Sequence, residues 1–134
     1  GVTGVQTCAL PIFARCVHVP RAASLTSRDL HAVQPRVILH ELAHAYHDQV
    51  LGFDHAGIRA AFEAAVAGGR YEEVLHVNGR TVRHYALTNH KEYFAEGTEA
   101  YFGANDFHPF VRAELAQHDA QLFALLREVW GPLP

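Results

Sequence analysis

The chain lacks three features that would each point to a class of protein. Its net charge of −3 gives it no basic excess, which argues against a nucleic-acid partner. No stretch approaches the roughly 18 uninterrupted apolar residues of a membrane-spanning helix, so we expect no membrane span. Repeats and low-complexity tracts are also absent. A chain of 134 residues can bury one core but is too short for two ordinary domains.

Cysteine is scarce, with only Cys8 and Cys16 in the chain. Cys8 falls in residues 1–12, which resemble a translated sequencing-adapter remnant, so we set that segment apart from the fold as non-native. The alternative is that 1–12 form an ordinary apolar N-terminal strand. Cys16 alone cannot form an internal disulfide, so the redox compartment cannot be read. On this interpretation residues 13–134 form an N-terminally truncated domain, and nothing in the sequence indicates its localisation.

Histidine is abundant instead, with 11 residues, and two of them belong to the most informative motif. Residues 40–44 read His-Glu-Leu-Ala-His. Residues four apart share one face of a helix, so His40 and His44 can direct two imidazole nitrogens at one metal ion. Glu41 stands beside them, where it can take a proton from a metal-bound water. This H-E-x-x-H spacing is typical of zinc peptidases, whereas the alternative is a surface helix with two solvated histidines.

Hydrophobic periodicity and turn signals predict a mostly helical α+β domain with one β-hairpin. Helices are expected at 35–51, 58–67, 89–102, 109–117 and 121–130, and a short strand at 16–20 leads into a loop at 21–34. Asn78-Gly79 within 73–85 predicts a hairpin with a type I′ turn. The expected N-caps are Asn89, Asn105 or Asp106, and Asp119. The expected helix stops are Gly52, Gly68-Gly69 and Gly131.

The same periodicity indicates which side chains pack inside. The motif helix carries a mostly apolar stripe of Val37, Ile38, Leu42, Ala45 and Gln49. We expect core packing from Tyr93, Phe94, Tyr101 and Phe102 and from Leu122, Leu125, Leu126 and Val129. Surface or capping roles are expected for the histidines without ligand spacing, which are His47, His55, His76, His84, His90, His108 and His118.

A catalytic zinc site needs a third protein ligand and an open position for water. The metzincin pattern requires glycine and histidine where this chain has His47 and Val50, so a carboxylate from a later element is expected. Glu63 has a spacing similar to that of the aminopeptidase gluzincins but lacks their sequence context, and a solvent-facing role is the commoner one for a lone glutamate. Glu92 also has an alternative, since Asn89-x-x-Glu92 has the spacing of a capping box.

The residues around Glu92 extend the motif. Tyr85, six intervening residues and then Glu92-Tyr-Phe-Ala-Glu96 follow the motif helix later in the chain. This order resembles the catalytic domain of anthrax lethal factor and related gluzincin zinc metallopeptidases, over roughly residues 35–100. The resemblance implies a small zincin-like fold. It also implies that Glu92 is the third zinc ligand and that Tyr85 donates a hydrogen bond to the reacting carbonyl.

With these roles the expected function is zinc-dependent hydrolysis of a peptide or protein substrate, with Zn²⁺ as cofactor and Glu41 as the base. Glu96 is one turn beyond Glu92 and can accept the second ring N–H of a ligand histidine, with Glu99 and Asp48 as weaker candidates. The alternative function is a non-catalytic zinc-binding interaction module derived from a peptidase. A third interpretation is a metal-free helical binding domain, in which Tyr85 is only a half-buried strand aromatic.

Overall fold

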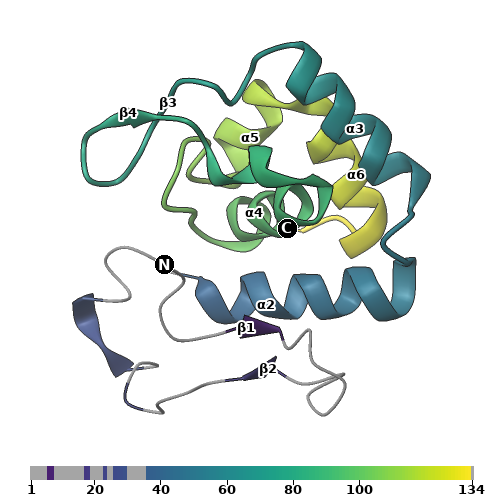
Figure 1. Cartoon of the computed structure of the whole chain (residues 1–134), viewed down its shortest axis with the longest axis horizontal. Helices are drawn as coiled ribbons and strands as arrows, with labels where there is room; N and C mark the ends of the chain where they lie inside the picture. The colour runs from purple at the N-terminus through teal and green to yellow at the C-terminus, as the bar shows by residue number, and fades with distance from the viewer. Residues whose placement is uncertain (1–5, 8–16, 19–22, 24–25, 30–35, 134) are drawn as a thin grey trace.

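The structure is a computed structural model that describes residues 6–7, 17–18, 23, 26–29 and 36–133. Its elements, in chain order, are β1 (Gln6–Thr7), β2 (Val17–His18), α2 (Val37–Tyr46), η3 (His47–Leu51), α3 (Ala56–Ala67), β3 (Val74–Leu75), β4 (Thr81–Val82), η4 (Tyr85–Thr88), α4 (His90–Phe102), α5 (Arg112–His118) and α6 (Ala120–Trp130). Helices predominate, and the strands form two short antiparallel pairs, so the expected α+β class is confirmed. Figure 1 shows α4 in the middle of the other helices, with α2 running beneath it.

A strand pair precedes the motif helix. β1 and β2 pair antiparallel, with Gln6 opposite His18, and both lie against α2. The sequence predicts only one hairpin, because residues 1–12 are set apart from the fold, so this pair is an addition. The remainder of 1–12, the ends of the expected strand at 16–20 and most of the loop at 21–34 lie outside the described residues. Within the described ranges, no helix is both long enough and apolar enough to cross a membrane.

The α-helix that carries the motif is shorter than predicted, and its apolar stripe is only partly buried. α2 ends at Tyr46, and the chain continues through a π-helical turn, η3, before Gly52 at φ 79° ends the helix as expected. Leu42, expected on the buried stripe, is 51% exposed, whereas Glu41 and His44 are buried. The motif face of α2 packs against α4 and divides the apolar stripe: Val37 is buried, whereas Leu42 faces outward.

Local capping signals place most of the other helices. The Asn89 side chain accepts hydrogen bonds at the start of α4, and Asp119 does so for α6. α3 ends before Gly68, as predicted. The exception is α5, which begins three residues later than expected and has no side-chain cap. Neither Asn105 nor Asp106 caps it, because the Asn105 side chain instead bonds the backbone of Glu96 and Phe107.

The hairpin forms where predicted, but its turn is not type I′. The strands pair Val74 with Val82, and the His76 N–H donates to the Arg80 carbonyl at 2.9 Å, so residues 77–79 form a three-residue loop. Gly79 has φ 83°, the left-handed conformation that such a loop requires at its last position. The predicted hairpin is confirmed, and the predicted turn type is wrong.

A tertiary contact explains the turn. The Val77 N–H donates to the Asp106 carbonyl at 2.8 Å, and the His108 N–H donates to the Leu75 carbonyl at 2.7 Å. The β3 segment therefore bonds to residues 106–108 on one side and to β4 on the other. A two-residue loop would have engaged Val77 with the opposite strand, and this contact excludes it.

α4 supplies the centre of the core. Every residue from Tyr93 to Tyr101 is buried. Leu122 of α6 packs directly on Gly97, where an added Cβ would lie 2.6 Å from the Leu122 Cδ2 atom, so α6 approaches this closely only because position 97 has no side chain. The core stripe predicted for α6 is confirmed: Leu122 and Leu126 are buried, and Leu125 and Val129 pack partly buried against the same core.

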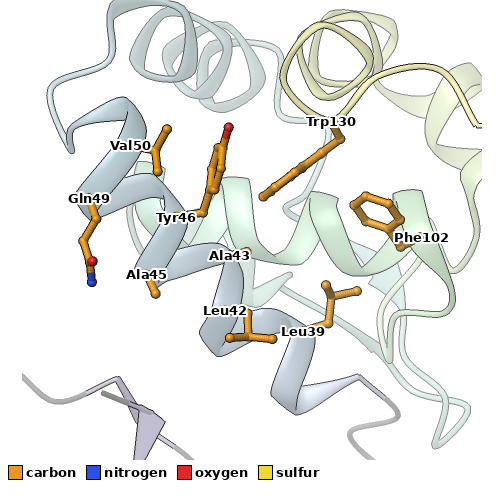
Figure 2. Close-up of a pocket in the computed structure, with 9 residues that line it drawn as sticks. All are labelled: Leu39, Leu42, Ala43, Ala45, Tyr46, Gln49, Val50, Phe102 and Trp130. Carbon is orange, nitrogen blue, oxygen red and sulfur yellow. The ribbon is translucent and has the colours of Figure 1, made fainter. Parts of the chain in front are cut away.

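Phe102 departs from its predicted core position and is 41% exposed. It lines an apolar groove of about 470 Å³ between α2 and the C-terminal ends of α4 and α6, shown in Figure 2. The groove uses the face of α2 that carries Leu39, Leu42 and Tyr46, which is distinct from the face with His40 and His44. Leu42 and Ala43 of the motif line the groove, but the two motif histidines do not.

Candidate metal centre

Three side chains from two helices converge at one point. His40 Nε2 lies 2.9 Å from Glu92 Oε2, and His44 Nε2 lies 3.2 Å from the same oxygen. The two imidazole nitrogens are 3.1 Å apart. The histidines stand on consecutive turns of α2, and Glu92 lies in the first turn of α4. The structure thus brings together the three residues that the sequence predicts as metal ligands.

The spacing of these three atoms fits a zinc ion. With metal–ligand bonds of roughly 2.0–2.2 Å and tetrahedral angles, two ligand atoms stand about 3.3–3.6 Å apart. The observed separations of 2.9, 3.1 and 3.2 Å are somewhat shorter, so small side-chain movements would make room for the ion. Two imidazole nitrogens and one carboxylate oxygen form a donor set that zinc prefers, and three protein ligands leave a fourth position for water.

The side chains of His40 and Glu92 shift each other's pKa values. Burial lowers the pKa of His40, but the Glu92 and Glu99 carboxylates raise it more, to about 11. Burial raises the pKa of Glu92, but its hydrogen bonds to His40 and His44 lower it more, to about 2. Without a metal, His40 therefore holds a proton that balances the carboxylate. A divalent ion can replace that proton, since a ligand histidine must be neutral.

The competing glutamate lies elsewhere. Glu63 is exposed on α3 and belongs to none of the groups of metal-ligating side chains found among the described residues. Only one of the two hydrogen bonds expected for a capping box is present here. The Asn89 side chain accepts from the Glu92 N–H at 3.0 Å, but the Glu92 carboxylate faces the two histidines. The geometry therefore favours Glu92 over Glu63 as the third ligand.

Tyr85 lies beside this cluster, at the start of η4 rather than at the end of a strand. The His84 ring caps η4, which turns the chain so that the Tyr85 and His40 ring centroids are 6.5 Å apart. Tyr85 is 40% exposed, so part of this residue is open to solvent beside the cluster. Burial and the nearby Glu92, Glu96 and Glu41 carboxylates raise its pKa, so it is a proton donor at neutral pH.

Glu41 is 6% exposed on the same side of α2 as the two histidines. Its charge contributes to the raised pKa of both Tyr85 and Glu99. All five residues predicted from the sequence for metal binding and catalysis therefore lie in one neighbourhood of the fold.

The remaining ring nitrogen of His40 has a different partner from the expected one. His40 Nδ1 lies 2.7 Å from Glu99 Oε1 and 3.5 Å from Glu96 Oε1. The sequence favours Glu96, because it is one turn beyond Glu92. The closer contact is with Glu99, two turns beyond Glu92.

The prediction for His47 is wrong. His47 is predicted at the surface or in a cap, yet it is fully buried against the rings of Phe53 and Phe94, and neither ring nitrogen has a hydrogen-bond partner among the described residues. Burial and nearby basic groups, first among them His90, lower its pKa to about 4. The available signal was its position three residues after His44, which puts it on the face that packs on α4.

The capping roles predicted for other histidines include two that the structure confirms. His55 Nδ1 accepts from the Ile58 N–H at the start of α3, and His84 Nδ1 accepts from the Ala86 N–H in η4. Burial lowers the pKa of His84 to about 3, which keeps this nitrogen free to accept. These histidines are accounted for without a metal.

Comparisons of the chain with protein families, with curated proteins and with solved structures find no match.

Proposed function

We propose that the chain is a zincin-like metallopeptidase domain of the gluzincin type, which hydrolyses peptide bonds with a zinc ion held by His40, His44 and Glu92. One observation carries the proposal: the donor atoms of these three residues stand 2.9 to 3.2 Å apart, with the Tyr85 ring beside His40. Glu41 follows His40 directly in the motif. All five belong to sequence elements whose order resembles a gluzincin, and α2 and α4, which carry the three ligands, lie in contact.

The chemistry follows from what each side chain can do. Zinc, when bound, supplies a water-derived nucleophile near neutral pH. The Glu41 carboxylate accepts the proton of that water and passes it to the leaving amine. The Tyr85 hydroxyl donates a hydrogen bond to the oxyanion that develops on the substrate carbonyl. Burial of the His40 and Glu92 side chains, 12% and 17% exposed, limits competition from solvent at the ligand set.

The second candidate is a zinc-binding interaction module that keeps the ligands and has lost catalysis. The presence of Glu41 favours the enzyme, because a purely structural zinc site has no need of a base. The two candidates share the metal and differ in turnover.

Zinc content and peptide cleavage test the proposal together. After dialysis the purified protein should hold one zinc per chain by elemental analysis and should cleave members of a library of unstructured peptides. Removing zinc with a chelator should abolish cleavage, and adding zinc back should restore it. Stoichiometric zinc without cleavage of any peptide would favour the interaction module. Protein that binds no zinc would contradict both candidates.

Tyr85→Phe tests the oxyanion donor. This variant removes one hydroxyl and keeps the ring that faces His40. We expect the rate of peptide cleavage to fall roughly 10²–10³-fold, as the loss of one oxyanion donor does, with zinc content and the unfolding temperature unchanged. Tyr101→Phe is a matched control, because the Tyr101 hydroxyl donates to the Gly131 carbonyl away from the centre. An unchanged rate in Tyr85→Phe would reduce the role of Tyr85 to packing.

A further inference from the structure

The His40 ring bridges two glutamates of α4. Its Nε2 atom lies 2.9 Å from Glu92 Oε2, and its Nδ1 atom lies 2.7 Å from Glu99 Oε1. Glu92 and Glu99 are seven residues apart, so they lie on one face of α4, about 10.5 Å apart along its axis. A single imidazole from α2 therefore spans two turns of α4, with one nitrogen directed at the ligand set and the other at a carboxylate behind it.

We propose that Glu99 is the positioning residue for His40 in the metal centre. This inference rests on the proposed function, because it needs a metal on His40 Nε2. Neutral imidazole carries its proton on either nitrogen, and only the tautomer with Nδ1–H leaves the Nε2 lone pair free for a metal. Glu99 accepts that Nδ1–H, which fixes both the tautomer and the ring orientation.

Glu99 fits this role better than Glu96. Seven residues of an α-helix return to within about 20° of the starting direction, whereas four residues overshoot by about 40°. Glu99 therefore shares the direction of Glu92 more closely, and its contact with His40 Nδ1 is 2.7 Å against 3.5 Å for Glu96. Both carboxylates are buried, with side chains 5% and 6% exposed, so burial does not distinguish them.

The two carboxylate oxygens of Glu96 have different neighbours: Oε1 lies 3.5 Å from His40 Nδ1. Its Oε2 atom has no hydrogen-bond partner among the described residues, and the nearest ring nitrogen, His84 Nδ1, is 3.9 Å away. That nitrogen already accepts from the Ala86 N–H, so it has no proton to donate to Glu96. Glu96 also lines a small internal cavity together with His84 and Asn105. Glu96 thus stays within reach of His40, in one group with His40 and Glu99, but Glu99 makes the closer contact with the ring.

Metal affinity tests this assignment without relying on turnover. We would measure the zinc dissociation constant by competition with a chromophoric chelator for the wild type, Glu99→Ala, Glu99→Gln and the matched control Glu96→Gln. We expect Glu99→Ala to weaken zinc binding roughly 10–100-fold, as loss of such a partner typically does. Glu99→Gln keeps an acceptor oxygen and the side-chain shape, so it should recover part of the affinity. Glu96→Gln should weaken zinc binding less than either Glu99 variant does, because the Glu96 carboxylate lies farther from His40 Nδ1.

A spectroscopic reading separates positioning from folding. Cobalt(II) in place of zinc should give a visible absorption band that shifts more in both Glu99 variants than in Glu96→Gln. If Glu99→Ala fails to fold by circular dichroism, the near-isosteric Glu99→Gln decides: its affinity must fall and its cobalt band must shift. A larger effect of Glu96→Gln would assign the role to Glu96, and wild-type affinity in both Glu99 variants would overturn the proposal.

The outcomes also separate this inference from the proposed function. Absence of peptide cleavage with the expected order of zinc affinities would contradict the peptidase and leave Glu99 in its role. Cleavage with unaltered affinity in the Glu99 variants would contradict only the role of Glu99. A wild type that binds no zinc would contradict both.

Discussion

Glu41→Gln is expected to lower peptide cleavage roughly 10²–10⁴-fold, the range that a positioned general base contributes. Glutamine keeps the size and helix propensity of the side chain but cannot take a proton from the nucleophile. Because Glu41 is not one of the three converging donors, zinc content should remain at one per chain. The measurement is the cleavage rate of the best library peptide at equal zinc loading.

The control for this result is Glu63→Gln, the same chemical change on the exposed face of α3. It should cleave at the wild-type rate. Equal turnover by the wild type and Glu41→Gln would remove Glu41 from the mechanism, while the metal centre could still stand.

The second large effect is loss of zinc from the ligand variants. His44→Ala and Glu92→Ala each remove one of three donors, which should weaken zinc binding by more than the 10–100-fold typical of an outer partner. Glu63→Ala should bind zinc as the wild type does. Elemental analysis after dialysis, together with chelator competition, measures both. Zinc loss in Glu63→Ala with retention in Glu92→Ala would move the third ligand to α3.

Wherever a local signal determines the structure, the sequence predicts it well. Asn89 and Asp119 cap α4 and α6 because a short polar side chain can satisfy the nearby N–H groups without help from the rest of the fold. The i, i+4 spacing of His40 and His44 likewise needs only a helix. For the same reason the convergence of the histidines could be anticipated from a pentapeptide.

The predictions fail where contacts with a distant segment of the chain determine the local structure. In the three-residue hairpin loop, the Val77 N–H donates to the Asp106 carbonyl. Local turn preferences cannot predict this hydrogen bond, because Asp106 is far away in the sequence. The outward position of Leu42 follows from the packing of the motif face on α4, which reverses the usual relation between hydrophobicity and burial. The choice of Glu99 over Glu96 depends on how α2 lies against α4, and single-helix spacing does not fix that arrangement.

The close approach of α6 to α4 at Gly97 constrains how sequences with this fold can diverge. With Leu122 Cδ2 2.6 Å from where a Cβ would stand, even alanine at position 97 requires the Leu122 side chain to shift. Changes at the two positions therefore affect each other, although they lie on different helices. Gly97 directly follows Glu96 and lies between Glu92 and Glu99. Sequence changes in the helix that carries these glutamates are therefore restricted by the side chains of α6. A sequence that keeps the ligand spacing but carries a large residue at this point would need a different partner for α4.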